Sequence, residues 1–219
     1  MLQLDQVKQS GYAFLSEYQP HKSSEVALGQ FGPLLKLGTG PAVHRLRPMR
    51  TDGAPLNTYS GQYGLNSFPF HTDFAHWRLP PRYLALRCVR GSKVPTLLLD
   101  GGVAVESDSR KLLIRSKMRP RRPVKGSMPL LRLFEPREDH WGLLRWDASF
   151  IVPTDHTAEE GAEYLSRWVL GQTAKVFRLM NPGDTLIVDN WRMLHARGDV
   201  GEDDLDRAID RAYTQDIYG

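Results

Sequence analysis

One short segment, residues 68–73, reads Phe-Pro-Phe-His-Thr-Asp and offers two possible metal ligands, His71 and Asp73. Because residues i and i+2 of a strand point to the same side, the imidazole and the carboxylate can converge on one ion while Thr72 points away. A second imidazole from another strand would complete a two-histidine, one-carboxylate site, which suits Fe(II) and leaves coordination positions open. A His-x-Asp triplet is also common by chance, and a surface hydrogen bond between the two side chains is the simpler alternative.

A second imidazole is available much later in the chain. His195 comes 124 residues after His71, and we place it at the end of an apolar strand over residues 185–189. Arg207 and Arg211 follow and, being four residues apart, can share one face of an element. A guanidinium group is suited to bind a carboxylate through two parallel hydrogen bonds. The order of these residues therefore predicts a metal site with a carboxylate-binding site beside it.

The elements that must position these residues are mainly short strands. Apolar runs at 83–86, 96–99 and 185–188 are bounded by turn-forming residues and are short, which favours buried strands over helices. A helix is predicted over residues 2–10, and the turn signal at 100–102 precedes a further apolar run at 103–105. Many short strands with one or two helices are typical of a mainly β sandwich or jelly roll with flanking helices.

Two other segments carry strong local signals. Thr157-Ala-Glu-Glu160 fits a capping box, which predicts that a helix begins there. Eight lysine and arginine side chains fall within residues 110–125, and Pro120 and Pro123 exclude a regular helix or a central strand from the second half of this segment. We expect an exposed loop there, and a single domain over residues 1–219 in which residues 105–140 form a lid or insertion.

Composition narrows the class of protein. The chain has 219 residues, 41% of them hydrophobic and 25% charged, which is ordinary for a globular domain. Cys88 is the only cysteine, so an internal disulfide is excluded, and its apolar neighbours predict a buried residue and not a nucleophile. The first residues lack the features of a secretory signal and no apolar run is long enough to span a bilayer, so we expect a cytoplasmic protein without a membrane partner.

Three separated motifs resemble one family. Residues 183–197, Gly-Asp-Thr-Leu-Ile-Val-Asp-Asn-Trp-Arg-Met-Leu-His-Ala-Arg, are similar to the distal-histidine motif of the taurine dioxygenase and γ-butyrobetaine hydroxylase family. Phe-His-Thr-Asp at 70–73 resembles the first ligand motif of that family, and Pro-Thr-Leu-Leu at 95–98 resembles its 2-oxoglutarate-binding segment. The stretch from Arg207 to Tyr213 is similar to the arginine-bearing end. The likeness spans about residues 65–213.

The resemblance implies a double-stranded β-helix (a cupin-like jelly roll) and an oxygenase that uses Fe(II) and 2-oxoglutarate. It implies His71, Asp73 and His195 as iron ligands. Thr96 and Arg211 would bind the distal carboxylate of 2-oxoglutarate, with Arg207 assisting, and which arginine makes the main ion pair stays open. Halogenating members lack the carboxylate ligand, so the resemblance implies hydroxylation, desaturation or ring closure at an unactivated C–H, with release of succinate and CO2.

The substrate side is less constrained by the sequence. We expect a small molecule bearing an acidic group, free or bound to a carrier protein, and we do not expect nucleic acid. Substrate-pocket candidates close to the first motif are Asn66, Phe74, His76 and Trp77. Asn190, Trp191 and Arg192 are interpreted as structural supports of the distal strand.

Two other functions compete with this prediction. One is a non-catalytic jelly-roll module that binds a polyanion through basic residues 110–125, a role that charge clusters of this kind can serve. The other is a zinc hydrolase with the same three ligands. The polyanion module leaves the metal motif unexplained, and the hydrolase leaves Thr96 and the arginine pair unexplained.

Overall fold

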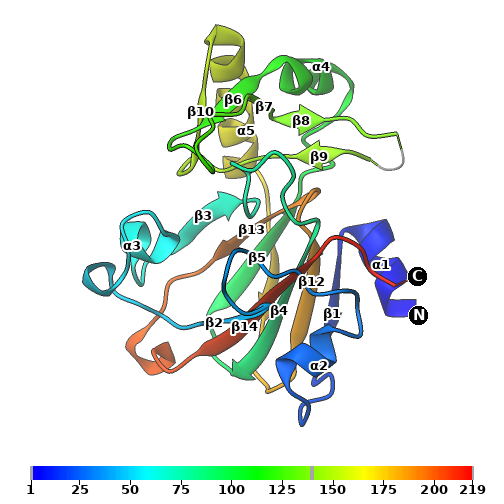
Figure 1. Ribbon diagram of the computed structural model, residues 1–219, viewed down its shortest axis with the longest axis vertical. Coiled ribbons are helices and arrows are strands. Elements are labelled where there is room, and N and C mark those ends of the chain that lie inside the picture. Colours follow the sequence, from blue (N-terminus) through cyan, green and yellow to red (C-terminus); the bar gives the residue numbers. More distant parts are fainter. Residues whose placement is uncertain (1, 139–140, 219) are drawn as a thin grey trace.

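Two antiparallel sheets form the larger part of the protein, as seen in a computed structural model that describes residues 2–138 and 141–218 (Figure 1). The five-stranded sheet has the order β1 (Tyr12–Leu15), β12 (Thr185–Asp189), β4 (Tyr83–Arg90), β14 (Ala208–Thr214) and β2 (Val43–Leu46). The four-stranded sheet has the order β11 (Lys175–Arg178), β5 (Pro95–Asp100), β13 (Met193–Arg197) and β3 (Phe68–His71). The expected buried strands at 83–86, 96–99 and 185–188 are all present.

An apolar core joins the two sheets. Leu84, Leu186 and Ile209 of the larger sheet belong to one buried cluster with Leu98 and Met193 of the smaller sheet. A second cluster covers the other face of the larger sheet and includes side chains of α1 (Leu2–Ser10) and α2 (Ser24–Leu28). β12 is buried along its whole length because it carries apolar surface on both sides. The sheets therefore form a rigid frame for the residues at their edges.

The remaining elements form a second layer at one end of the sheets, drawn at the top of Figure 1. They are α4 (Ser107–Arg115), α5 (His156–Leu170), a three-stranded sheet and a two-stranded sheet. The three-stranded sheet has the order β10 (Ile151–Pro153), β6 (Lys117–Pro120) and β7 (Leu131–Arg132), and the two-stranded sheet pairs β8 (Phe134–Glu135) with β9 (Leu143–Leu144). Their apolar side chains form one cluster that reaches Leu99 and Leu194 of the four-stranded sheet.

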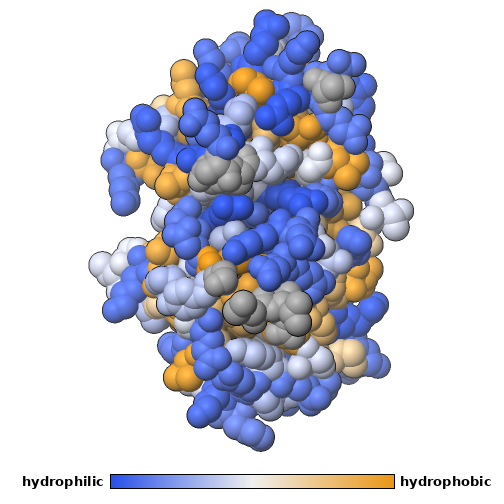
Figure 2. Space-filling view, turned by 90° about the vertical axis from the view of Figure 1, so that its right-hand side faces the viewer, coloured by the Kyte–Doolittle hydropathy of each residue, from blue (hydrophilic) through white to orange (hydrophobic). Residues whose placement is uncertain are grey.

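The smallest elements are α3 (Tyr59–Tyr63) and two 3-10 turns, η1 (Thr51–Gly53) and η2 (Glu202–Asp204). Figure 2 shows a face on which hydrophilic side chains predominate between smaller hydrophobic areas, as expected when most apolar surface lies in the three clusters. None of the described helices is long and apolar enough to cross a membrane.

The basic segment differs from the prediction of an exposed irregular loop. Residues 117–120 form β6, the central strand of its sheet, with Met118 and Pro120 buried and Lys117 and Arg119 exposed. The prediction was wrong for residues 117–120, because Pro120 stands at the last position of the strand, where its missing N–H interrupts no further pairing. Residues 121–125 are irregular and mostly exposed, as predicted. Cations from 110 to 115 lie on α4, so the eight charges are divided among a helix, a strand and a loop.

Two local predictions also need correction. α5 begins at His156, with the Asp155 side chain accepting a hydrogen bond from Ala158 N at 2.9 Å, so Thr157 lies in the first turn and is not the cap. Asp155 takes this role because its carboxylate caps a helix better than a threonine hydroxyl two residues later. Residues 101–104 form turns and no strand follows at 103–105, where the chain leads into α4.

Candidate metal centre

His71 and His195 are neighbours because of strand pairing. β13 runs antiparallel to β3, with His195 directly opposite His71, and the two imidazole centroids lie 4.3 Å apart. The sequence suggested that His195 lies at the end of β12. It lies instead in the middle of β13. The chain turns through residues 190–192 and crosses to the other sheet before His195.

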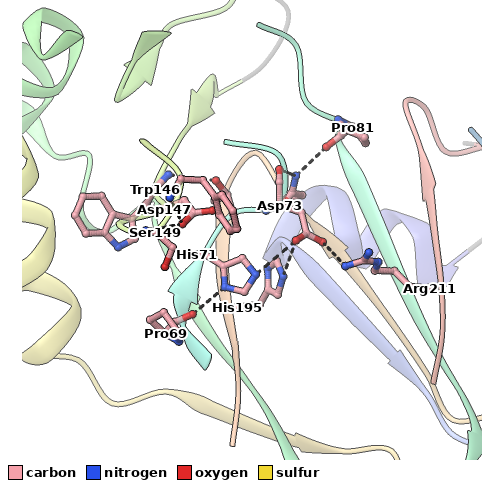
Figure 3. A network of polar contacts seen from close by, with 12 residues as sticks. Pro69, His71, Asp73, Pro81, Trp146, Asp147, Ser149, His195 and Arg211 are labelled. Carbon is pink, nitrogen blue, oxygen red and sulfur yellow. Dashed lines mark hydrogen bonds and ion pairs between the residues drawn. The ribbon is translucent and has the colours of Figure 1, made fainter. Parts of the chain in front are cut away.

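Asp73 completes a compact cluster just beyond the end of β3 (Figure 3). Its Oδ1 lies 3.5 Å from His71 Nε2 and 3.7 Å from His195 Nε2. All three side chains are buried, and one possible ligand atom from each lies within 4.8 Å of the others. Two imidazoles and one carboxylate converging on a point match the donor set of a mononuclear non-haem iron site.

Hydrogen bonds fix the orientation of these groups. Pro69 O lies 2.8 Å from His71 Nδ1, which places the proton on that nitrogen and leaves the Nε2 lone pair directed at the cluster (Figure 3). Asn190 grips the backbone of Asp73, accepting from its N–H at 2.7 Å and donating to its carbonyl at 3.0 Å. Asn190 is thus a structural support, as its position in the sequence suggested. The side-chain hydroxyl of Thr72 accepts a hydrogen bond from the backbone N–H of Trp146 at 3.2 Å.

The second carboxylate oxygen of Asp73 is held by β14. Tyr213 donates a hydrogen bond to Oδ2 at 2.5 Å, and Arg211 Nη1 lies 3.7 Å from the same oxygen. Sequence reasoning missed Tyr213. Its signal was the i, i+2 spacing from Arg211, which puts both side chains on one face of a strand. Oδ1 is left facing the two imidazoles.

The electrostatics favour the deprotonated form of two of the three ligands, Asp73 and His195. Burial alone would raise the pKa of Asp73, but His195, His71 and Arg211 outweigh it and hold this pKa well below its ordinary value. Burial and the neighbouring His71 lower the pKa of His195. Burial also acts to lower the pKa of His71, but Asp73 more than compensates and raises it. Metal ligands must be deprotonated, so the ionised carboxylate and the neutral His195 need no proton release to bind a cation.

These ligands open into a cavity of about 450 Å³, hereafter the metal cavity, between the two sheets. Thr96, Arg207 and Arg211 line it, so the structure brings all three expected 2-oxoglutarate-binding residues to the same space. Thr96 and Arg207 are 4% and 7% exposed. Within the described residues the guanidinium of Arg207 has no ion pair or hydrogen bond, whereas Arg211 faces Asp73.

Two residues of the metal cavity lie outside every motif. Asp147 is 2% exposed, and its Oδ1 accepts hydrogen bonds from Ser149 N at 2.9 Å and Phe150 N at 3.1 Å. Burial raises the pKa of this carboxyl. The ring of Tyr59, from α3, packs 4.2 Å from the ring of His71. No local pattern marks either residue, because only the fold brings their segments to the ligands.

Of the four residues expected in the substrate pocket, two line the metal cavity and two do not. Phe74 and His76 line the metal cavity. Asn66 is exposed and outside the lining, and its carbonyl accepts a hydrogen bond from Arg197. Trp77 packs on Phe74 at 4.5 Å from behind and does not line the cavity either. Cys88 is buried, with burial raising its pKa to about 11, so it is not a nucleophile.

No family model matches the sequence. Solved structures do match, and they define the class of fold: the protein has the fold of the non-haem iron oxygenases. An asparagine oxygenase solved with Fe(II), 2S,3S-3-hydroxyasparagine and succinate aligns with a TM-score of 0.69 and 19% identity, over 96% of this chain and 77% of that one. The non-haem iron oxygenase OrfP, solved with Fe and α-ketoglutaric acid, aligns with a TM-score of 0.70 and 20% identity, over 97% and 79%.

The PvcB protein from Pseudomonas aeruginosa aligns similarly, with a TM-score of 0.68 and 19% identity over 95% of this chain and 77% of that one. Other asparagine oxygenase and OrfP structures are matched over 56% and 58% of their length. The family resemblance read from the motifs is therefore confirmed at the level of the fold.

Proposed function

We propose that this protein is an Fe(II)- and 2-oxoglutarate-dependent oxygenase. The observation that carries the proposal is the buried cluster of His71, Asp73 and His195 in the wall of a cavity also lined by Arg207, a buried arginine whose side chain makes no ion pair or hydrogen bond within the described residues. The donor set fits Fe(II), and the free Nε2 lone pair of His71 supports this role. Bound Fe(II) with 2-oxoglutarate would supply O2-dependent oxidation of a C–H bond, with succinate and CO2 as co-products.

Within this proposal, Arg207 and Thr96 hold the distal carboxylate of 2-oxoglutarate. A buried guanidinium without a partner carries a desolvation cost that an anionic ligand offsets. Arg211 is already beside a proposed metal ligand, whereas the two carboxylates of 2-oxoglutarate are separated by three carbons. We therefore give the main ion pair to Arg207 and place Arg211 on the substrate side of the metal.

The substrate proposed is an amino acid. Arg211 and Asp147 present opposite charges to the metal cavity, an arrangement that suits a carboxylate and an ammonium group on one molecule. The matched proteins are described with 3-hydroxyasparagine and with (3S)-hydroxy-L-Arg, both amino acids hydroxylated at carbon 3. Hydroxylation of an unactivated C–H of a free amino acid is the reaction that this combination supports, since an amino acid held on a carrier protein as a thioester has no free carboxylate for Arg211.

The same proposal includes the type of β-fold, the insertion at residues 105–140 and the cellular compartment. The two antiparallel sheets would form the double-stranded β-helix of these oxygenases, with residues 105–140 as an insertion on a single domain. The buried free thiol of Cys88 is compatible with a reducing cytoplasm.

The deciding experiment measures succinate formed from 2-oxoglutarate under O2 with added Fe(II) and a panel of amino acids. His71→Ala and His195→Ala should abolish turnover while the circular dichroism spectrum stays unchanged. Near wild-type succinate release by either variant would remove the ligand assignment. Amide or ester cleavage with Zn(II), and no succinate with Fe(II), would favour the hydrolase.

A further inference from the structure

A second pocket of about 650 Å³, hereafter the outer pocket, lies beside the metal cavity. The two spaces share Asn57, His76 and Phe150 in their walls. The outer pocket is completed by Pro120 at the end of β6, by residues 121–124 after it, and by residues 62–63 of α3. The loop after β6 therefore lies next to the metal cavity, across a wall that the two spaces share.

The rim of the outer pocket is basic. Arg121 and Arg122 line it and are exposed, and no carboxylate is found among its described lining residues. Arg121 donates from Nη2 to Ala148 O at 3.1 Å, which holds the guanidinium in place and leaves its other donors free. Arg122 has no ion pair or hydrogen bond within the described chain. Of the eight cations between 110 and 125, these are the two whose side chains face this space together.

The inner wall is built from ordered polar contacts. Tyr63 Oη and Ser149 Oγ lie 2.9 Å apart and tie α3 to the loop before β10. His76, on the wall common to both spaces, has a buried Nδ1 with no hydrogen-bond partner.

We propose that the substrate is elongated, with its reacting end in the metal cavity and an anionic group, such as a phosphate or a carboxylate, bound by Arg121 and Arg122. This inference rests on the proposed oxygenase function and adds a substrate class to it. Two guanidinium groups on one rim suit a planar or tetrahedral oxyanion, because each offers paired N–H donors. The site is exposed, so its affinity depends on ionic strength.

Binding to the metal-free protein, measured by calorimetry, tests the pocket apart from catalysis. The first probe is pyrophosphate. The second is a matched pair of amino acids of equal length, 2-amino-7-phosphonoheptanoate and 2-aminooctanoate, whose side chain is uncharged. Proteins compared are the parent, Arg122→Gln, Arg121→Gln/Arg122→Gln, and a control, Lys111→Gln/Arg115→Gln, which removes two exposed cations from α4 outside both cavities. Arg122→Gln removes no hydrogen bond or ion pair of the described residues, so it remains informative if the double variant misfolds.

We expect the phosphonate to bind about tenfold more tightly than its uncharged partner, the gain of one charge-assisted contact. The affinity advantage of the phosphonate and the affinity for pyrophosphate should both fall in the two arginine variants and at higher salt. Both should be unchanged in the α4 control. Equal binding of the two amino acids, or a phosphonate advantage that survives Arg121→Gln/Arg122→Gln, overturns the proposal. Absence of 2-oxoglutarate-dependent succinate release alongside intact anion binding would instead count against the oxygenase function alone.

Discussion

At the scale of single residues, Asp73 uses its two oxygens differently. Oδ1 faces both imidazoles, and Oδ2 is held by Tyr213 and Arg211. Partners behind a ligand fix its orientation and raise the affinity of the site for its metal.

Tyr213→Phe should therefore weaken metal binding without unfolding the protein. Loss of such a supporting hydrogen bond typically costs about 10- to 100-fold in affinity. The check is the dissociation constant for Mn(II), used as a redox-inert probe, with Tyr12→Phe on β1 as the control. Equal affinities of Tyr213→Phe and the parent would show that this hydrogen bond does not position Asp73.

The two arginines make separable contributions under the proposal. Arg207→Gln should raise KM for 2-oxoglutarate by about 10- to 100-fold, since a hydrogen bond to a charged group contributes roughly 1.5–3 kcal/mol. Arg211→Gln should act mainly on KM for the amino-acid substrate. Initial rates with each ligand varied in turn distinguish these effects, and the reverse ranking would return the 2-oxoglutarate site to Arg211.

At the scale of elements, β14 lies in the interior of the five-stranded sheet, because one of its edges pairs with β2 and the other with β4. Arg45 of β2 makes two hydrogen bonds to Asp210 of β14, at 2.8 and 3.0 Å. Burial opposes ionisation of Asp210, but Arg45 outweighs it and lowers the pKa of this carboxyl.

This pair predicts a pH-dependent effect of Asp210→Asn. A lowered folded-state pKa stabilises the protein above the unfolded value of about 3.9, and the benefit is lost as pH falls through the folded value. Because Arg45 is 46% exposed, the variant should lose only about 0.5–1 kcal/mol of unfolding free energy at pH 7. Urea titrations at pH 7 and pH 3 should show this difference shrinking at the lower pH; a constant difference would point to packing instead.

α5 approaches the end of α4 closely at Gly161, where it faces Ser116. A Cβ at this position would lie 2.1 Å from Ser116 Oγ and 2.8 Å from Ser116 Cβ. Gly161→Ala should thus destabilise the protein by about 1–3 kcal/mol, although alanine is the better helix former by about 1 kcal/mol. Gly53→Ala, where a Cβ meets nothing within 4 Å, is the matched control for thermal unfolding. A stabilised Gly161→Ala protein would mean that the two elements are less tightly packed.

At the scale of the whole molecule, the metal cavity lies between the two sheets that pack on one core. Ligands that bind there should stabilise the entire fold by mass action, by about 2.7 kcal/mol at a hundred times the dissociation constant. We expect Mn(II) with 2-oxoglutarate to raise Tm in a concentration-dependent way, and His195→Ala to remove the increase. An equal rise in the variant would place the binding elsewhere.

The sequence alone determined what depends on neighbouring positions in the chain. His71 and Asp73 were predicted on one side of a strand because strand side chains alternate, and apolar runs located β4, β5 and β12 by their length. The resemblance of three motifs to one family implied the class of fold and the cluster of His71, Asp73 and His195.

Only the tertiary structure decided what depends on strand register and on contacts between distant segments. Pairing of β13 with β3 set His195 opposite His71. The packing of β14 behind Asp73 brought in Tyr213 and separated the surroundings of Arg207 from those of Arg211. No local sequence pattern marks Asp147 or Tyr59 as part of the site. The presence of Pro120 argued against a central strand where β6 is found. These features depend on long-range contacts, which local periodicity does not encode.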